Sequence, residues 1–324
     1  MEKKEKVIKP DFEKPIEVSG YEEIKTNVNE ARKGFLTKHS NLIKKNKISS
    51  GIFFVVAIGM VFLGYFLPKL IGLSIGLICA SMVVVWLYTR YQRKMMDEAV
   101  SEYLYAYSIN CNSYLYSGED FKDIEIGYKQ RPDHELLKKF YICDDISQII
   151  SRELVTGKMY GHDFIAADVS LKSGDAKKQR NMKALLVGKA IVFNYSFQEE
   201  GRTLLYLKGC GDAAPTKLDD VNKVSINKLK EKWEVYTSHK NYQKIFTDSV
   251  IKALNKIDCD DTLNDVVISI VPGHVLIGLS YCDAAMVIPM QNDYETTYFE
   301  HKVEDFEKVK LLNKALIENE NIKK

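Results

Sequence analysis

The chain has 324 residues, of which 46% are hydrophobic, a composition typical of a globular protein of one or two domains. Its 46 Lys and Arg residues nearly balance its 44 Asp and Glu residues and give a net charge of +2. This balance argues against a nucleic-acid-binding protein, which usually carries a clustered basic excess. The six cysteines include no CxxC pair, so the sequence predicts reduced thiols and no disulfide framework.

The N-terminal residues 1–47 are predicted to form a cytoplasmic tail followed by a basic amphipathic helix. Residues 1–19 are rich in charge and are predicted to be disordered, whereas apolar residues recur at helical spacing from Tyr21 onward. The basic end of this helix contains three candidate contacts for lipid or a partner, namely Lys44, Lys45 and Lys47. Two interpretations stay open: the helix lies on anionic lipid, or it packs on the rest of the protein and its charges serve only as topology signals.

Residues 48–88 are predicted to form a transmembrane helical hairpin. Residues 48–67 are 20 uncharged residues and residues 70–88 are 19 more, separated by Pro68 and Lys69. At about 1.5 Å per residue, each run matches the roughly 30 Å of a bilayer's hydrocarbon core. Core helices of globular proteins nearly always keep a polar stripe, so a buried hairpin is the less favoured interpretation.

The charges that flank the hairpin predict its orientation. Basic residues precede the first run and follow the second, whereas the turn between them carries only Lys69. We therefore expect a two-span protein of the inner (plasma) membrane whose N- and C-termini are both cytoplasmic. Small residues at Gly72, Gly76 and Ala80 permit close approach of another helix, either the first span or a second copy of the chain.

Residues 89–324 are predicted to form a cytoplasmic α+β domain of mainly antiparallel strands with flanking helices. Helical patterns cover 90–116, 135–140, 242–257 and 303–317, and the tyrosines of the first pattern favour packing over chemistry. Period-two patterns and turn residues predict strands at 164–169, 184–193, 202–208, 233–237, 265–271, 274–280 and 286–289.

From about Tyr88 onward, three segments taken in order carry a family resemblance. The first is DDISQIISRELVTGKMYGHDFIAADV (144–169), the second LLVGKAIVFNYSFQEEGRTLLYL (185–207), and the third KWEVYTSHKNYQKIFTDSVIKALNKI (232–257). This order resembles the bacterial membrane-anchored family known as DUF3137, a domain of unknown function. The sequence departs from the family pattern near Ala190 and Asp248. The resemblance implies a membrane-tethered cytoplasmic α+β domain and provides no catalytic residue.

No catalytic, cofactor-binding or metal-binding residue is predicted, and no cofactor is expected. The His162–Asp163 dipeptide lacks the further His and Asp residues that a metal-dependent hydrolase requires. Cys210 lies between two glycines, and a structural or loop role is favoured over a reactive one. The basic segment 172–183 is either a solvated loop or a contact for acidic lipid or an acidic protein. Its candidate contact residues are Lys177, Lys178, Arg180 and Lys183.

The predicted function is that of a membrane-tethered cytoplasmic binding or scaffolding module. Its partners are expected to be the lipid bilayer and either a protein or a second copy of the chain, with no nucleic acid. The alternative is a membrane-anchored enzyme whose site the sequence does not reveal. A transport or channel accessory role fits less well, because two uncharged spans offer no ion pathway.

Overall fold

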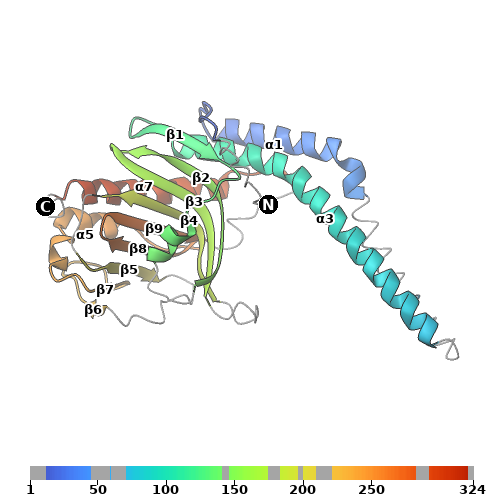
Figure 1. Ribbon diagram of the computed structural model, residues 1–324. Helices are drawn as coiled ribbons and strands as arrows, with labels where there is room; N and C mark the ends of the chain where they lie inside the picture. The colour runs from blue at the N-terminus through green and yellow to red at the C-terminus, as the bar shows by residue number, and fades with distance from the viewer. Residues whose placement is uncertain are drawn as a thin grey trace, which may run out of the picture. The chain divides into compact units, whose positions relative to one another are not determined.

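Figure 1 shows the computed structural model, which describes residues 12–44, 59, 71–140, 146–173, 183–195, 200–208, 221–281 and 292–319. Its helices are α1 (Tyr21–Lys38), α3 (Ile71–Leu115), α4 (His134–Phe140), the 3-10 helix η3 (Tyr242–Lys244), α5 (Asp248–Leu254) and α7 (Thr297–Ile317). Its strands are β1 (Phe121–Gly127), β2 (Ile146–Met159), β3 (His162–Ser173), β4 (Lys183–Asn194), β5 (Thr203–Lys208), β6 (Asn222–Val224), β7 (Trp233–Thr237), β8 (Leu263–Val271) and β9 (His274–Tyr281).

The nine strands form one sheet in the order β1-β2-β3-β4-β9-β8-β5-β7-β6. Every pairing between neighbouring strands is antiparallel. Strands β1 to β4 follow one another as a meander, whereas the β8–β9 hairpin is inserted between β4 and β5, which are consecutive along the chain. The expectation of a mainly antiparallel sheet with helices therefore agrees with the structure.

Both faces of the central strands are buried, because alternate side chains of a strand point to opposite faces. On one face, Phe164 of β3 packs against Phe193 of β4 with ring centroids 6.2 Å apart. Tyr116, which follows α3, and Phe306 of α7 lie on the same aromatic group, with ring centroids 5.1 Å apart. Phe121 of β1 completes this aromatic cluster.

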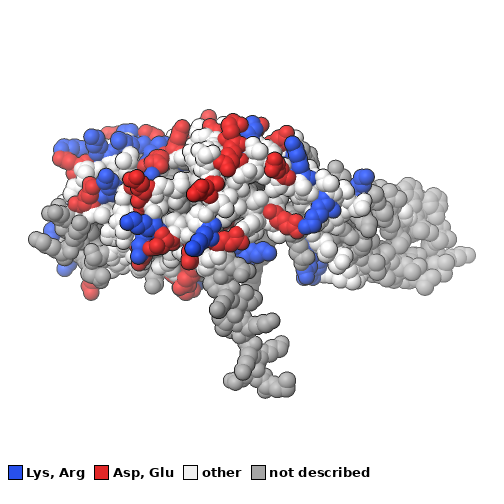
Figure 2. Space-filling model, turned by 90° about the horizontal axis from the view of Figure 1, so that it is seen from above, with Lys and Arg blue, Asp and Glu red and all other residues white. Residues whose placement is uncertain are grey.

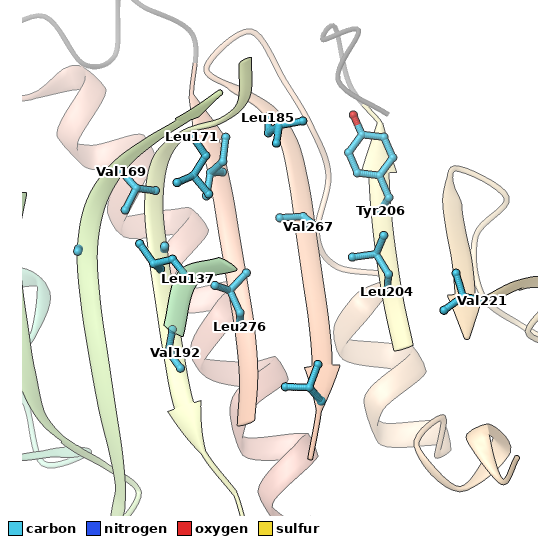
Figure 3. Packing of buried hydrophobic residues seen from close by; sticks show 14 residues of the cluster. Leu137, Val169, Leu171, Leu185, Val192, Leu204, Tyr206, Val221, Val267 and Leu276 are labelled. Atoms are coloured by element: carbon cyan, nitrogen blue, oxygen red, sulfur yellow. The ribbon is translucent and has the colours of Figure 1, made fainter. Parts of the chain in front are cut away.

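The opposite face of the sheet carries an aliphatic cluster (Figure 3). It draws Val169 and Leu171 from β3, Val192 from β4 and Leu276 from β9, all 9% exposed or less. Leu137 of α4 lies among them and is 1% exposed. Helix α4 therefore packs on this face, and the aromatic cluster belongs to the other.

The helices near the C-terminus follow the predicted apolar stripes with altered ends. Helix α7 includes the predicted helix 303–317 and buries Phe306, Val309 and Leu312, but it begins earlier, at Thr297. The predicted helix over 242–257 is wrong in its extent, because the chain forms η3 and then α5. Thr247 has an extended backbone between them, and its hydroxyl accepts a hydrogen bond from the Val250 N–H at 3.4 Å, the geometry of an N-cap.

The chain divides into two compact units, residues 1–24, 108–289 and 295–324 in the first and residues 25–107 and 290–294 in the second. The first unit contains the sheet. In the second, Phe35 of α1 stacks on Tyr103 of α3 with centroids 6.4 Å apart. Lys38 pairs with Glu102 at 2.9 Å in the same unit.

The predicted transmembrane hairpin requires correction. The first expected span, 48–67, lies outside the described residues except for Gly59. The second expected span is not a separate element, because it is the first part of the 45-residue helix α3, which continues through the exposed Arg90 and Lys94. Among the residues that the structure describes, no helix combines the length and apolar character needed to cross a bilayer.

This finding overturns the predicted two-span hairpin and, with it, the membrane and transmembrane assignment and the inner-membrane localisation with cytoplasmic termini. The prediction rested on uncharged runs of sufficient length. Such a run meets the length criterion even where it belongs to a longer, charged helix. Trp86, in the second uncharged run, is exposed and has the Arg90 guanidinium 5.3 Å from its ring centroid.

Candidate functional site

Charged side chains converge between the aromatic face of the sheet and the helices that pack on it. We refer to Asn112, Glu153, Asp168, Lys189 and Lys302 as the buried charge cluster. They come from α3, β2, β3, β4 and α7, all within the first unit. Asn112, Glu153 and Lys189 are 3%, 5% and 9% exposed, respectively, whereas Asp168 and Lys302 are partly exposed, so the cluster is buried at its centre and reaches toward the surface at its edge.

The register of the sheet brings the central ion pair together. Asp168 of β3 lies directly opposite Lys189 of β4, which places both side chains on the same face. The Lys189 Nζ is 3.0 Å from Asp168 Oδ1. Phe164 and Phe193 occupy this face further along the same strands. The ion pair therefore lies on the same face of the sheet as the aromatic cluster, at a position where the two strands form a salt bridge and not an apolar contact.

A β-bulge in β2 positions Glu153. The pairing with β3 shifts register between Arg152 and Val155, and Glu153 has a positive φ of 59°. A non-glycine residue in this conformation is strained and is held by surrounding structure. Its N–H donates to the Tyr128 carbonyl at 3.2 Å. The bulge thus holds a carboxylic acid in the interior at a backbone geometry that the regular strand would not give.

The last turns of α3 connect the helix to these charges. Asn112 accepts a hydrogen bond from Lys189 Nζ at 3.2 Å through Oδ1. Its Nδ2 donates to Glu153 Oε2 at 3.4 Å and to Ser108 Oγ at 3.2 Å. One buried amide therefore bridges β2, β4 and the helix, and it satisfies groups that would otherwise be costly to bury.

The environment shifts the pKa values of the ion pair in opposite directions. Burial alone would raise the pKa of Asp168, but the nearby Lys189 and Lys302 ammonium groups hold it below its ordinary value. Burial alone would lower the pKa of Lys189, but Asp168 and the neighbouring acidic groups raise it. Both groups therefore stay charged at neutral pH, as a mutually stabilised pair.

Glu153 and Lys302 behave differently from that pair. Burial raises the pKa of Glu153 to about 7, and the negative charge of Asp168 acts in the same direction. Burial lowers the pKa of Lys302, an effect that Asp168 opposes and Lys189 reinforces. The Lys302 Nζ lies 5.4 Å from the centroid of the Tyr281 ring. Glu153 is thus the member of the cluster that exchanges a proton near neutral pH.

Tyr116 covers the cluster from the aromatic side. Its ring lies 5.9 Å from Lys189 Nζ, a cation–π distance, and stacks on Phe164 at 5.5 Å. Burial raises its pKa to about 12. Within the described part of the chain its buried hydroxyl has no hydrogen-bond partner. The cluster can therefore hold a proton and fix α3 against the sheet, in a place closed off by aromatic rings.

The basic residues predicted as contacts are not brought into one site by the described structure. Lys44 is exposed at the end of the helical segment after α1. Lys183 is the first residue of β4, and its side chain lies outside the description. Five of the candidates lie outside the described residues altogether, namely Lys45, Lys47, Lys177, Lys178 and Arg180. Gly72, Gly76 and Ala80 lie in α3.

His162, considered above as part of a possible metal site, and His274 each make local contacts. The His162 ring stacks on Tyr195 at 5.7 Å, and His274 Nδ1 lies 3.0 Å from Asn194 Oδ1. Across the described ranges, no three His, Cys, Asp or Glu side chains are grouped so as to hold a metal ion. Cys210 lies outside those ranges.

The buried charge cluster was missed from the sequence, although a signal for it exists. Asp168 interrupts the apolar run FIAADVSL, and Lys189 interrupts LLVGKAIVF. A charge in the middle of a strand that is otherwise apolar needs a buried partner. Where two neighbouring strands each carry such a charge, an ion pair between them can be predicted, provided that the register of the strands is known.

Comparisons with known proteins give little further guidance. No family model matches the chain, and no curated protein matches it. One solved structure, described as the crystal structure of the mycobacterial trehalose monomycolate transport factor A, TtfA, is similar to it at 11% identity and a TM-score of 0.35. The match covers 64% of this chain and 95% of that one. A likeness this weak supports no inference about fold or function.

Proposed function

We propose that this chain is a protein-binding or scaffolding module. The proposal rests on one observation: the ionisable groups of the buried charge cluster are paired with one another in the interior. Asp168, Lys189 and Asn112 satisfy one another beneath Tyr116, so the cluster stabilises the fold and α3. A group that acts on a substrate must come within hydrogen-bonding reach of it. Kinship with the DUF3137 family, a domain of unknown function, remains part of this proposal.

The exposed surface has the character expected of a binding module that recognises shape and backbone. Figure 2 shows acidic and basic side chains interspersed over the face in view. Mixed charge of this kind keeps a protein soluble without steering it toward one highly charged ligand. Isolated apolar side chains such as Tyr298 and Leu311 are exposed on α7.

An enzyme is the second candidate, and one observation favours it. Perturbed pKa values gather at catalytic sites, and the pKa of Glu153 rises to about 7 while that of Lys302 falls. The two candidates differ in whether Glu153 is required. Enzymatic activity through this cluster would be lost on replacing Glu153 by Gln, whereas binding at the surface would not.

The test is crosslinking and co-purification of the full chain from its native cells, followed by reconstitution with the purified partner. We expect a saturable complex whose affinity is the same for the wild type and Glu153→Gln, because this side chain is buried. A conversion of the partner, or of a small molecule, that requires Glu153 would contradict the binding role. Absence of any reproducible partner would also overturn it.

A further inference from the structure

The outer edge of β1 already holds an extended piece of the chain. Glu13 forms an antiparallel bridge with Ile126 outside the regular strands. The Glu13 N–H donates to the Ile126 carbonyl at 2.9 Å, and the Ile126 N–H donates to the Glu13 carbonyl at 2.9 Å. This edge therefore presents a donor and an acceptor with the spacing that an added strand requires.

The segment that occupies the edge is held mainly through its backbone. The side chains of Glu13, Lys14 and Pro15 are exposed, and Ile16 is 42% exposed. Besides the bridge, the Ile16 N–H donates to Ser113 Oγ at 3.0 Å. In an antiparallel ladder the next pair would be Pro15 with Ile124, but proline has no N–H to donate. Among the described residues, the pairing is thus limited to Glu13 and Ile126.

One side chain of the segment, that of Phe12, packs against β1. A Cβ atom placed on Gly127 would lie 2.5 Å from Cγ of Gln130 and 3.0 Å from Cε1 of Phe12, so the Phe12 ring shares the bare backbone of this glycine with the Gln130 side chain. Because Gly127 has no side chain, the ring can approach the strand closely. The edge therefore combines backbone recognition at Ile126 with one position suited to an aromatic residue.

We propose that the outer edge of β1 is the docking site for an extended segment of a partner protein, which replaces residues 12–16 and places an aromatic residue over Gly127. This inference rests on the binding function proposed above and assigns it a surface. Strand addition of this kind uses main-chain hydrogen bonds for affinity and a side-chain position for specificity. The chain's own segment competes with the partner, because its attachment gives it a high effective concentration.

The test uses the full chain in two matched variants. Glu13→Pro removes the N–H that donates to Ile126, whereas Lys14→Pro makes the same chemical change at a residue that takes no part in the bridge. A fluorescent peptide of residues 12–19 is the probe, since the structure shows how its first residues lie against the edge. We expect it to bind Glu13→Pro about tenfold or more tightly than Lys14→Pro. A Phe12→Ala peptide should bind more weakly.

Hydrogen–deuterium exchange locates the site. The Ile126 amide should lose protection in Glu13→Pro and regain it when the peptide is added. Equal peptide binding by both variants, no binding by either, or binding without protection of Ile126 would overturn the inference. A partner obtained by co-purification should displace the labelled peptide. A partner that binds without displacing it would preserve the proposed function and exclude this edge as its interface.

Discussion

The pKa of one carboxyl group links the interior of this protein to the pH of its surroundings. Glu153 holds its proton more tightly in the folded chain, at a pKa of about 7, than at the ordinary value of 4.5. Its contribution to stability is therefore fully present below pH 4.5 and is lost as the pH rises through 7. Across this interval the folded chain binds more protons than the unfolded chain.

Replacing Glu153 by Gln should remove this pH dependence, because an amide mimics the protonated acid at every pH. We expect the free energy of unfolding of the wild type to fall by about 1–3 kcal/mol between pH 5 and 8 on this account. The variant should show a flatter curve in urea unfolding followed by circular dichroism. Glu119→Gln, at an exposed carboxylate, is the control. Equal slopes for the two variants would contradict the assignment.

The ion pair between Asp168 and Lys189 makes a separate prediction. Lys189→Met leaves a buried carboxylate without its cation and should lower the free energy of unfolding by about 3–5 kcal/mol. Adding Asp168→Asn to this variant should recover most of the loss, since no buried charge is then left uncompensated. A double-mutant cycle in urea measures the coupling. Additive effects of the two substitutions would show that the pair does not act as a unit.

At the scale of the elements, the contact between β4 and β9 depends on a glycine. A Cβ atom on Gly188 would overlap the Leu279 carbonyl of β9, which is backbone and cannot move aside without breaking the ladder. Gly188→Ala should therefore destabilise the protein by about 1–3 kcal/mol or more. Gly34→Ala, in α1 with nothing near its Cβ, should instead stabilise by about 0.5–1 kcal/mol. Thermal unfolding of both variants measures whether the two substitutions change the stability of the protein in opposite directions.

Regular strands were predictable from the sequence, and bulged strands were not. The strand 233–237 matches β7, and the strands at 184–193 and 274–280 match β4 and β9 within a residue or two. Strand β1 was missed because its register shifts between Lys122 and Glu125, so that its apolar residues do not alternate. The bulge at Glu153 interrupts β2 in the same way. Apolar and polar residues alternate along a strand only where no bulge interrupts its pleat.

The buried charge cluster could not be assembled from the sequence for a related reason. Asn112 and Lys189 are separated by 77 residues, and only the packing of α3 on the sheet brings them together. Asp168 and Lys189 become neighbours only through the register of β3 with β4. A charge within an apolar strand predicts that a buried partner of opposite charge exists, but it does not identify the helix or strand that carries this partner.

At the scale of the whole molecule, the two compact units should differ in their response to a local defect. Phe35 of α1 is 3% exposed and packs on Tyr103 in the second unit. Phe35→Ala removes this contact and should cost about 3–5 kcal/mol of local stability. Hydrogen–deuterium exchange should then quicken in 25–44 and 100–107, while the amides of β3, β4, β8 and β9 keep their protection. Uniform loss of protection would mean that the units unfold together.

The predicted membrane hairpin shows what a whole-molecule view adds to a local pattern. An uncharged run of 19 residues satisfied every local criterion for a span. The structure instead continues this run as α3 to Leu115, whose last turns carry Ser108 and Asn112 into the sheet's charge cluster. The helical pattern predicted over 90–116 belongs to this same helix, so the error lay in assigning the first part of one continuous helix to a bilayer.

The insertion of the β8–β9 hairpin between β4 and β5 has a consequence for synthesis on the ribosome. Strand β4 ends at Asn194, and its partner β9 begins at His274, 80 residues later (274 − 194). At about 5–20 residues per second, the side of β4 that receives β9 waits about 4–16 s for its partner. During that time the nascent meander β1–β4 displays an unpaired apolar strand, Leu185 to Phe193. Cellular yield should therefore depend on chaperones that shield this strand until translation has passed Tyr281.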